Sequence, residues 1–128
     1  MKKSLICLLA FILLFSLASC EVSSYKALML VKTVNDDYCE ASFKYLDGKL
    51  VLNPRYTGSG ETDIHYVATL EEGEVNVYYV YCDVKQPLFN IKAGESIDAR
   101  GGYIEKGRQT IIIETVTPAK GKITVTFD

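Results

Sequence analysis

Cysteine, histidine and tyrosine are the residues of this chain whose side chains could do chemistry. Its 128 residues include four cysteines, one histidine and nine tyrosines, and no tryptophan. A cysteine thiol can carry a lipid, form a disulfide or bind a metal, and a histidine can act as a general base. A tyrosine ring gives a binding surface an apolar body with a polar tip. Which of these chemistries is used depends on the residues that the sequence places beside each side chain.

Cys39 and Cys82 are the only candidates for a disulfide with each other inside the expected domain. Alternation along the strand that contains Cys82 would turn its side chain away from the core, unless the strand ends there. The adjacent Asp83 favours such an end. Two interpretations therefore stay open, a disulfide between Cys39 and Cys82 and a pair of buried free thiols.

His65 and the acidic turns are the weaker candidates for chemistry. An Asp63–His65 pair on the polar face of a strand could activate a serine, but no Gly-x-Ser-x-Gly elbow is present. Two thiols and one distant histidine lack the spacing of zinc ligands, and acidic turns such as Asp36-Asp37 lack an EF-hand loop. We expect no catalytic residue, no metal site and no cofactor, and therefore a protein that is not an enzyme.

Tyrosines supply the candidate binding residues. Tyr78 lies opposite the face that we expect to be core, so it could form an exposed aromatic platform with Tyr38. Arg55 and Tyr56 are further candidates, because they lie in a loop from Asn53 to Gly60. Such residues suit the recognition of a glycan or a protein. Tyrosine is also a common residue of strands, so the rings could instead be covered by a second sheet.

The N-terminal segment is predicted to be an export signal. Lys2 and Lys3 precede an apolar run over residues 5–17, which is shorter than the roughly 20 residues that a spanning helix needs. Residues 17–20, Leu-Ala-Ser-Cys, resemble the lipobox of bacterial lipoproteins. The resemblance implies cleavage before Cys20, a diacylglyceryl thioether on its sulfur and acylation of its amine. Two or three acyl chains would give stable anchoring.

These assignments divide the chain into three parts. We predict a signal peptide over residues 1–19, a lipidated Cys20 with a short tether to residue 25, and one domain over residues 26–128. The resemblance places that domain outside the cytoplasm, anchored to a bacterial cell membrane or outer membrane. Removal of the two signal lysines leaves 12 basic and 16 acidic residues, a formal charge of −4. This charge argues against binding to nucleic acid.

Alternation with a period of two predicts that the domain is built from strands. Cys39, Ala41, Phe43 and Tyr45 share one face of a strand, and 64, 66, 68 and 70 share a face of another. Further strands are expected over 27–34, 49–52, 74–82, 88–92, 96–100, 109–117 and 122–127. Turns are expected at 47–48, 71–73, 93–95, 101–102 and 118–121. About eight short strands without helical periodicity indicate an all-β, antiparallel, immunoglobulin-like sandwich, with a small β-barrel as the alternative.

Two resemblances bear on function. A lipobox followed at once by a β-domain resembles many small bacterial lipoproteins, and residues 92–96, 101–105 and 120–122 look like the C-terminal half of their sandwich domains. This implies a non-catalytic binding or structural module with a protein or glycan ligand. Tyr38-Cys39 and the 55–60 segment resemble the lipoprotein inhibitors of c-type lysozyme, without their late cysteine and tryptophan. This second likeness implies an inhibitor or accessory subunit of an envelope enzyme, with the 53–60 loop inserted in the partner's cleft.

Overall fold

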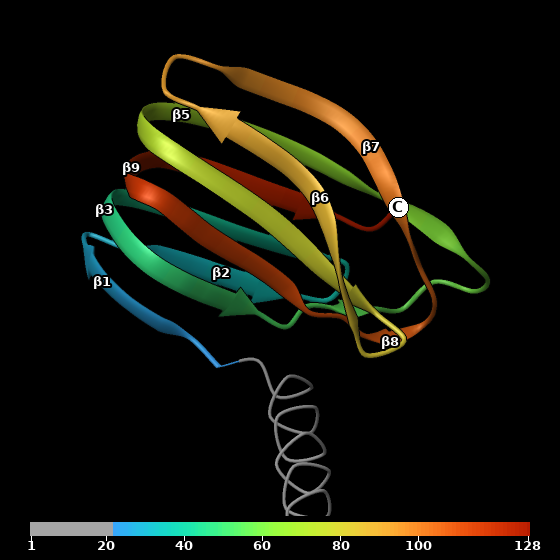
Figure 1. The fold of residues 1–128 in the computed structure, drawn as a ribbon. Coiled ribbons are helices and arrows are strands. Elements are labelled where there is room, and N and C mark those ends of the chain that lie inside the picture. The colour runs from blue at the N-terminus through green and yellow to red at the C-terminus, as the bar shows by residue number, and fades with distance from the viewer. Residues whose placement is uncertain (1–21) are drawn as a thin grey trace, which may run out of the picture.

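The computed structural model describes residues 22–128, which form an antiparallel all-β sandwich, as the sequence predicts (Figure 1). The predicted signal peptide and Cys20 lie outside the described residues. Among the residues described, no helix is long and apolar enough to cross a membrane. The strands are β1 (Ser24–Leu28), β2 (Val31–Asn35), β3 (Tyr38–Leu52), β4 (Arg55–Tyr56), β5 (Thr62–Tyr81), β6 (Val84–Lys92), β7 (Ser96–Ile104), β8 (Gly107–Arg108) and β9 (Ile111–Thr126).

Three long strands run through both layers of the sandwich. β3, β9 and β5 lie side by side in that order, and each bends near its middle. β9 pairs with β3 and β5 along most of its length, whereas the two halves of β3 and of β5 pair with different outer strands. β3 pairs first with β2 and then with β1, and β5 pairs first with β7 and then with β6. One sheet is thereby folded onto itself. We call the layer with β1 and β6 the front layer and the layer with β2 and β7 the back layer (Figure 1).

Three segments predicted to be turns are instead bends inside continuous strands. The expected turns at 47–48, 71–73 and 118–121 fall within β3, β5 and β9, where the register shifts. A Cβ on Gly73 would lie 2.2 Å from the Pro118 carbonyl oxygen, and a Cβ on Gly121 would lie 2.3 Å from that of Thr69. Glycine is therefore needed where neighbouring strands approach closely at the fold line. The predicted turn at 101–102 also lies inside a strand, β7.

The core lies between the two layers and follows the predicted alternation over most of its length. Cys39, Ala41 and Phe43 point inward from β3, and the inward residues of β5 include all four predicted at 64, 66, 68 and 70. The prediction for Tyr45 was wrong. A register shift follows Phe43, so Leu46 takes the buried position and Tyr45 is 36% exposed. The bulge shifts the alternation by one residue, so that the even-numbered Leu46 faces the core after the odd-numbered Phe43.

Candidate functional site

The structure separates the two tyrosines that were expected to share a platform. Tyr78 lies on the outer side of the front layer, because Val77 before it is in the core. Tyr38 lies on the outer side of the back layer, because Cys39 after it points inward. The Tyr38 hydroxyl donates a hydrogen bond to Glu40, which holds the pKa of that carboxyl below its ordinary value. The two rings therefore belong to opposite surfaces, and the predicted platform is not formed.

Tyr56 is a core residue rather than a binding residue. Its ring is 6% exposed and packs edge-on against Phe127, with ring centroids 6.2 Å apart, and Gly58 lies against it. Arg55, the preceding residue, is exposed on the other side of β4. Alternation along a two-residue strand thus separates the two candidates, one into the core and one onto the surface.

The segment from Asn53 to Gly60 is tied to the rest of the domain. The Thr57 amide donates to Asp37 Oδ1 at 2.7 Å, and the Asp37 amide donates to the Arg55 carbonyl oxygen at 2.7 Å. The Thr57 hydroxyl also donates to Asp37, and these bonds lower the pKa of the Asp37 carboxyl. The Gln109 amide donates to the Pro54 carbonyl oxygen at 2.8 Å. These hydrogen bonds hold residues 54–57 of the segment against the rest of the domain.

Cys39 and Cys82 are free thiols, so the candidate disulfide is not formed. Cys39 is buried in the core, and burial raises the pKa of its thiol to about 12. β5 ends at Tyr81, and Cys82 and Asp83 form an exposed turn with positive φ angles of 51° and 62°. The sequence correctly indicated that the strand ends beside Asp83. That ending leaves Cys82 on the surface instead of turning it toward Cys39.

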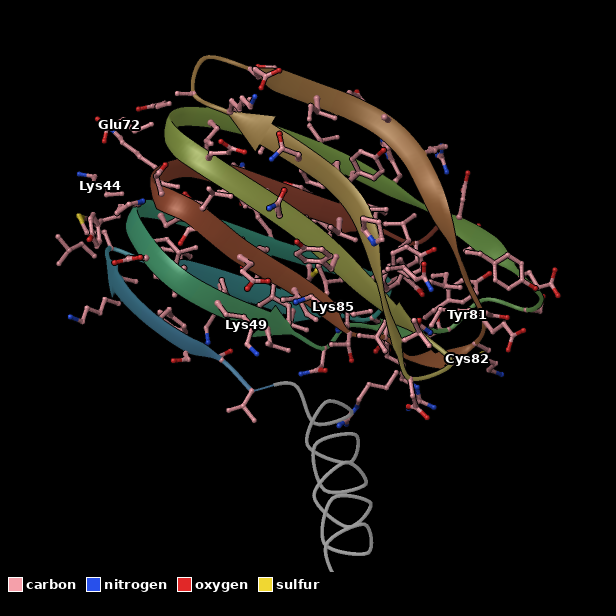
Figure 2. The ribbon with its side chains drawn as sticks, viewed as in Figure 1. Lys44, Lys49, Glu72, Tyr81, Cys82 and Lys85 are labelled. Atoms are coloured by element: carbon pink, nitrogen blue, oxygen red, sulfur yellow. The ribbon has the colours of Figure 1, made fainter. Side chains whose placement is uncertain are left out.

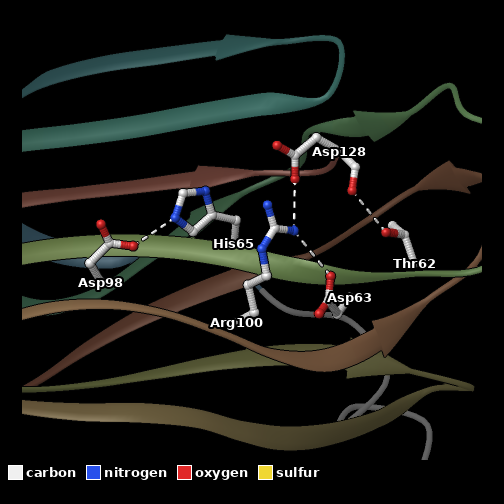
Figure 3. A network of polar contacts seen from close by, with 6 residues as sticks. All are labelled: Thr62, Asp63, His65, Asp98, Arg100 and Asp128. Atoms are coloured by element: carbon white, nitrogen blue, oxygen red, sulfur yellow. Dashed lines mark hydrogen bonds and ion pairs between the residues drawn. The ribbon is translucent and has the colours of Figure 1, made fainter.

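His65 belongs to an exposed polar network on the outer side of the back layer. Its Nε2 lies 2.8 Å from Asp98 Oδ1, and Arg100 lies 3.3 Å from Asp63 and 2.9 Å from Asp128 (Figure 3). Asp63 and His65, whose pairing was only one possibility from the sequence, instead make cross-strand pairs to β7. Within residues 22–128, no group of three potential metal ligands comes together.

The outer side of the front layer carries two parallel rows of side chains across β3, β9, β5 and β6. Register pairs align the residues of an apolar row, which consists of Val51, Ile112, Tyr78 and Pro87. The polar row beside it consists of Lys49, Glu114, Asn76 and Asn90. Lys85 lies beside this row on β6, opposite Val80 and two residues before Pro87. We call these nine residues the front face, of which Figure 2 labels Lys49 and Lys85.

Short contacts fix the side chains of the front face. The Lys85 ammonium lies 4.3 Å from the centroid of the Tyr78 ring and 2.9 Å from Glu114 Oε2. The Asn90 amide nitrogen donates to Asn76 Oδ1 at 2.8 Å. Ile112 is fully buried although it lies outside the main core cluster. The side chains beside Ile112 therefore cover it, so the front face has one buried apolar side chain beneath it.

Sequence reasoning identified only part of the front face. Alternation placed Asn76 and Tyr78 on one face of a strand, and that placement is confirmed. Lys85 and Glu114 were missed because they come from β6 and β9, 29 residues apart in the chain. No local motif marks either residue. The signal lies in the register of three strands, which the sequence alone does not specify.

Comparisons with known proteins do not identify the chain. No protein-family model matches it, and no curated protein matches its sequence. A solved carbohydrate-binding module of family 29 has a TM-score of 0.44 and 10% identity, over 82% of this chain and 75% of its own. A mutant family 29 module in complex with mannohexaose has the same TM-score at 9% identity, over 82% and 77% of the two chains. The Drosophila melanogaster CENP-C cupin domain has a TM-score of 0.32 and 10% identity, over 85% and 84%. Likenesses of this size decide nothing about the ligand of this chain.

Proposed function

We propose that this protein is a non-catalytic binding module that holds a glycan on its front face. The supporting observation is the pair of cross-strand rows in which the Tyr78 ring, the Lys85 ammonium and the Glu114 carboxylate are locked together. In the same proposal, Cys20 carries the lipid that anchors the domain outside the cytoplasmic membrane of a bacterium. β1 begins at Ser24, so the tether is shorter than the predicted 20–25 segment and would hold the front layer close to the envelope.

The chemistry of the front face matches that of a sugar ring. A pyranose has an apolar C–H surface, which packs on aromatic and aliphatic side chains, and a rim of hydroxyls, which need donors and acceptors. Val51, Pro87 and the part of the Tyr78 ring that Lys85 does not cover supply the apolar surface, and the polar row supplies amides and a carboxylate. An ammonium has three donors, so Lys85 can hold Glu114 and still donate to a ligand hydroxyl above the ring.

Affinity electrophoresis of the full chain in detergent tests this proposal. The gels would contain soluble β-glucan, mannan or xylan, and binding would retard the protein on at least one of them. We expect Tyr78→Ala to weaken that binding about tenfold or more, since a central aromatic residue commonly dominates the affinity of an interface.

Two further variants make the result specific. Asn90→Ala changes the polar row and leaves the cover of Ile112 intact, so it separates lost binding from lost stability. Tyr45→Ala is the matched control, because it removes an exposed tyrosine at the bend of β3. Equal retardation of the wild type, Tyr78→Ala and Asn90→Ala on every gel would refute glycan binding by the front face.

A further inference from the structure

We infer that Arg55 and Arg108 form a site for an oxyanion group, the carboxylate or sulfate of an acidic glycan. The small ribbon of β4 and β8 places Arg55 directly opposite Arg108. Residues directly opposite in an antiparallel pair lie on the same side, with Cβ atoms about 5 Å apart. Tyr56 and its partner Gly107 occupy the alternate position, and Tyr56 points into the core. Both arginines therefore face outward together.

These two arginines differ from the paired cations of the long strands. Lys85, Arg100, Lys120 and Lys122 each have an acidic partner within 4 Å. Within the described residues, neither Arg55 nor Arg108 has an ion-pair partner or a side-chain hydrogen bond. Like charges directly opposite each other destabilise a strand pair. A bound anion would relieve this repulsion.

Both arginines line one open depression of about 510 Å³. Its other lining residues include Asn35, Asn53 and a single acidic residue, Asp36. Two guanidinium groups and one carboxylate give this lining a formal charge of +1, although the mature chain as a whole carries −4. This depression therefore carries a local positive charge on a protein whose overall charge is negative.

The backbone around the site is held in place before any ligand binds. The Arg55 carbonyl oxygen accepts from the Asp37 amide, and the Gln109 amide beside Arg108 donates to Pro54. Thr110 Oγ1 donates to Asn53 Oδ1 at 3.2 Å. Two guanidinium groups that project from this fixed backbone can contact the oxygens of one carboxylate or sulfate in a bidentate manner.

The position of the depression connects this site with the front face. Asn53 follows Val51 of the apolar row by two residues, and it lines the depression. One glycan chain could therefore lie on the front face and place an acidic group between the arginines. This choice of a glycan as the source of the anion rests on the proposed function, whereas the anion site itself does not.

Paired probes that differ only in charge test this inference. The full chain in detergent would be run in affinity gels that contain pectate, fully methyl-esterified pectin, dextran sulfate or dextran, at 150 mM salt. We expect retardation by pectate or dextran sulfate that exceeds retardation by its neutral counterpart. Arg55→Gln and Arg108→Gln should each weaken this binding about tenfold, because each removes charged hydrogen bonds to the anion. Arg55→Lys should recover only part of it.

Lys106→Gln is the matched control, because it removes one exposed charge next to this ribbon without lining the depression. It should change binding less than twofold. Equal losses in Lys106→Gln and the arginine variants, or equal binding of charged and neutral polymers without any arginine-dependent binding of inorganic sulfate, would overturn the site. Binding of inorganic sulfate that depends on both arginines, combined with equal binding of charged and neutral polymers, would overturn the glycan as the source of the anion. Loss of neutral-glycan binding in Tyr78→Ala is a separate readout, so the two proposals can fail independently.

Discussion

At the scale of single residues, burial decides what each cysteine of the domain can do. Cys39 is 1% exposed, and its thiol loses the solvation that would stabilise a thiolate. Cys82 lies on the surface in the turn that joins β5 to β6. The sequence identified both cysteines and correctly indicated that alternation along the strand turns the Cys82 side chain away from the core. It could not show which thiol is buried, because that depends on where β5 ends.

The two thiols should therefore react differently with an alkylating reagent. In the native protein at pH 8, iodoacetamide should modify Cys82 and leave Cys39 unmodified, because the pKa of Cys39 is about 12 and its thiolate is scarcely populated. Peptide mass spectrometry measures both sites, and unfolding in urea should expose Cys39 as a control. Recovery of a Cys39–Cys82 disulfide from the unreduced protein would contradict the arrangement of free thiols.

At the scale of elements, glycine positions explain both the success and the failure of the strand predictions. Alternation located the strands well, because a half-buried strand must alternate wherever it lies in the fold. The same glycine signal marked a true turn at Gly94 and a bend within β5 at Gly73. Both residues have φ angles near +85°, so local conformation does not separate them. Only the contact with a neighbouring strand distinguishes the bend from the turn, and the local sequence does not specify that pairing.

These two glycines form a matched pair for measurement. Gly94→Ala has nothing within 4 Å of the new Cβ, so it should cost only the left-handed conformation, about 1 kcal/mol. Gly73→Ala adds a Cβ at 2.2 Å from the Pro118 carbonyl oxygen, and it should reduce the free energy of unfolding by about 3 kcal/mol or more. Urea unfolding measures both. Similar losses in the two variants would show that β5 and β9 do not approach closely at the bend.

At the scale of the whole molecule, the folded sheet presents separate surfaces that the sequence could not assemble. Tyr78 was identified from alternation, whereas the pairing of Arg55 with Arg108 joins residues 53 positions apart through the short β4–β8 ribbon. The all-β class followed from periodicity and turn residues. The folding of one sheet into two layers did not, because it depends on bends whose glycines also suit hairpins.

The proposed anchor makes a prediction about location. In a bacterial host, the wild-type chain should sediment with membranes, and Cys20→Ala should move to the soluble or secreted fraction, because the acyl chains supply most of the membrane affinity. Metabolic labelling with a palmitate analogue should follow the same pattern, and Cys82→Ala should remain labelled as a control. Unchanged sedimentation of Cys20→Ala would contradict the lipid anchor.

Residue-resolved NMR titration is the most direct test of the front face as the binding surface. The ¹⁵N-labelled full chain in detergent would be titrated with the glycan that gives the strongest retardation in affinity gels. We predict that amide shifts concentrate at 49–51, 76–80, 85–90 and 112–114, and that the back-layer residues 38–42 and 96–100 do not move. Shifts confined to the back layer, or no shifts at a glycan concentration that gives full retardation in the gels, would contradict the proposed function.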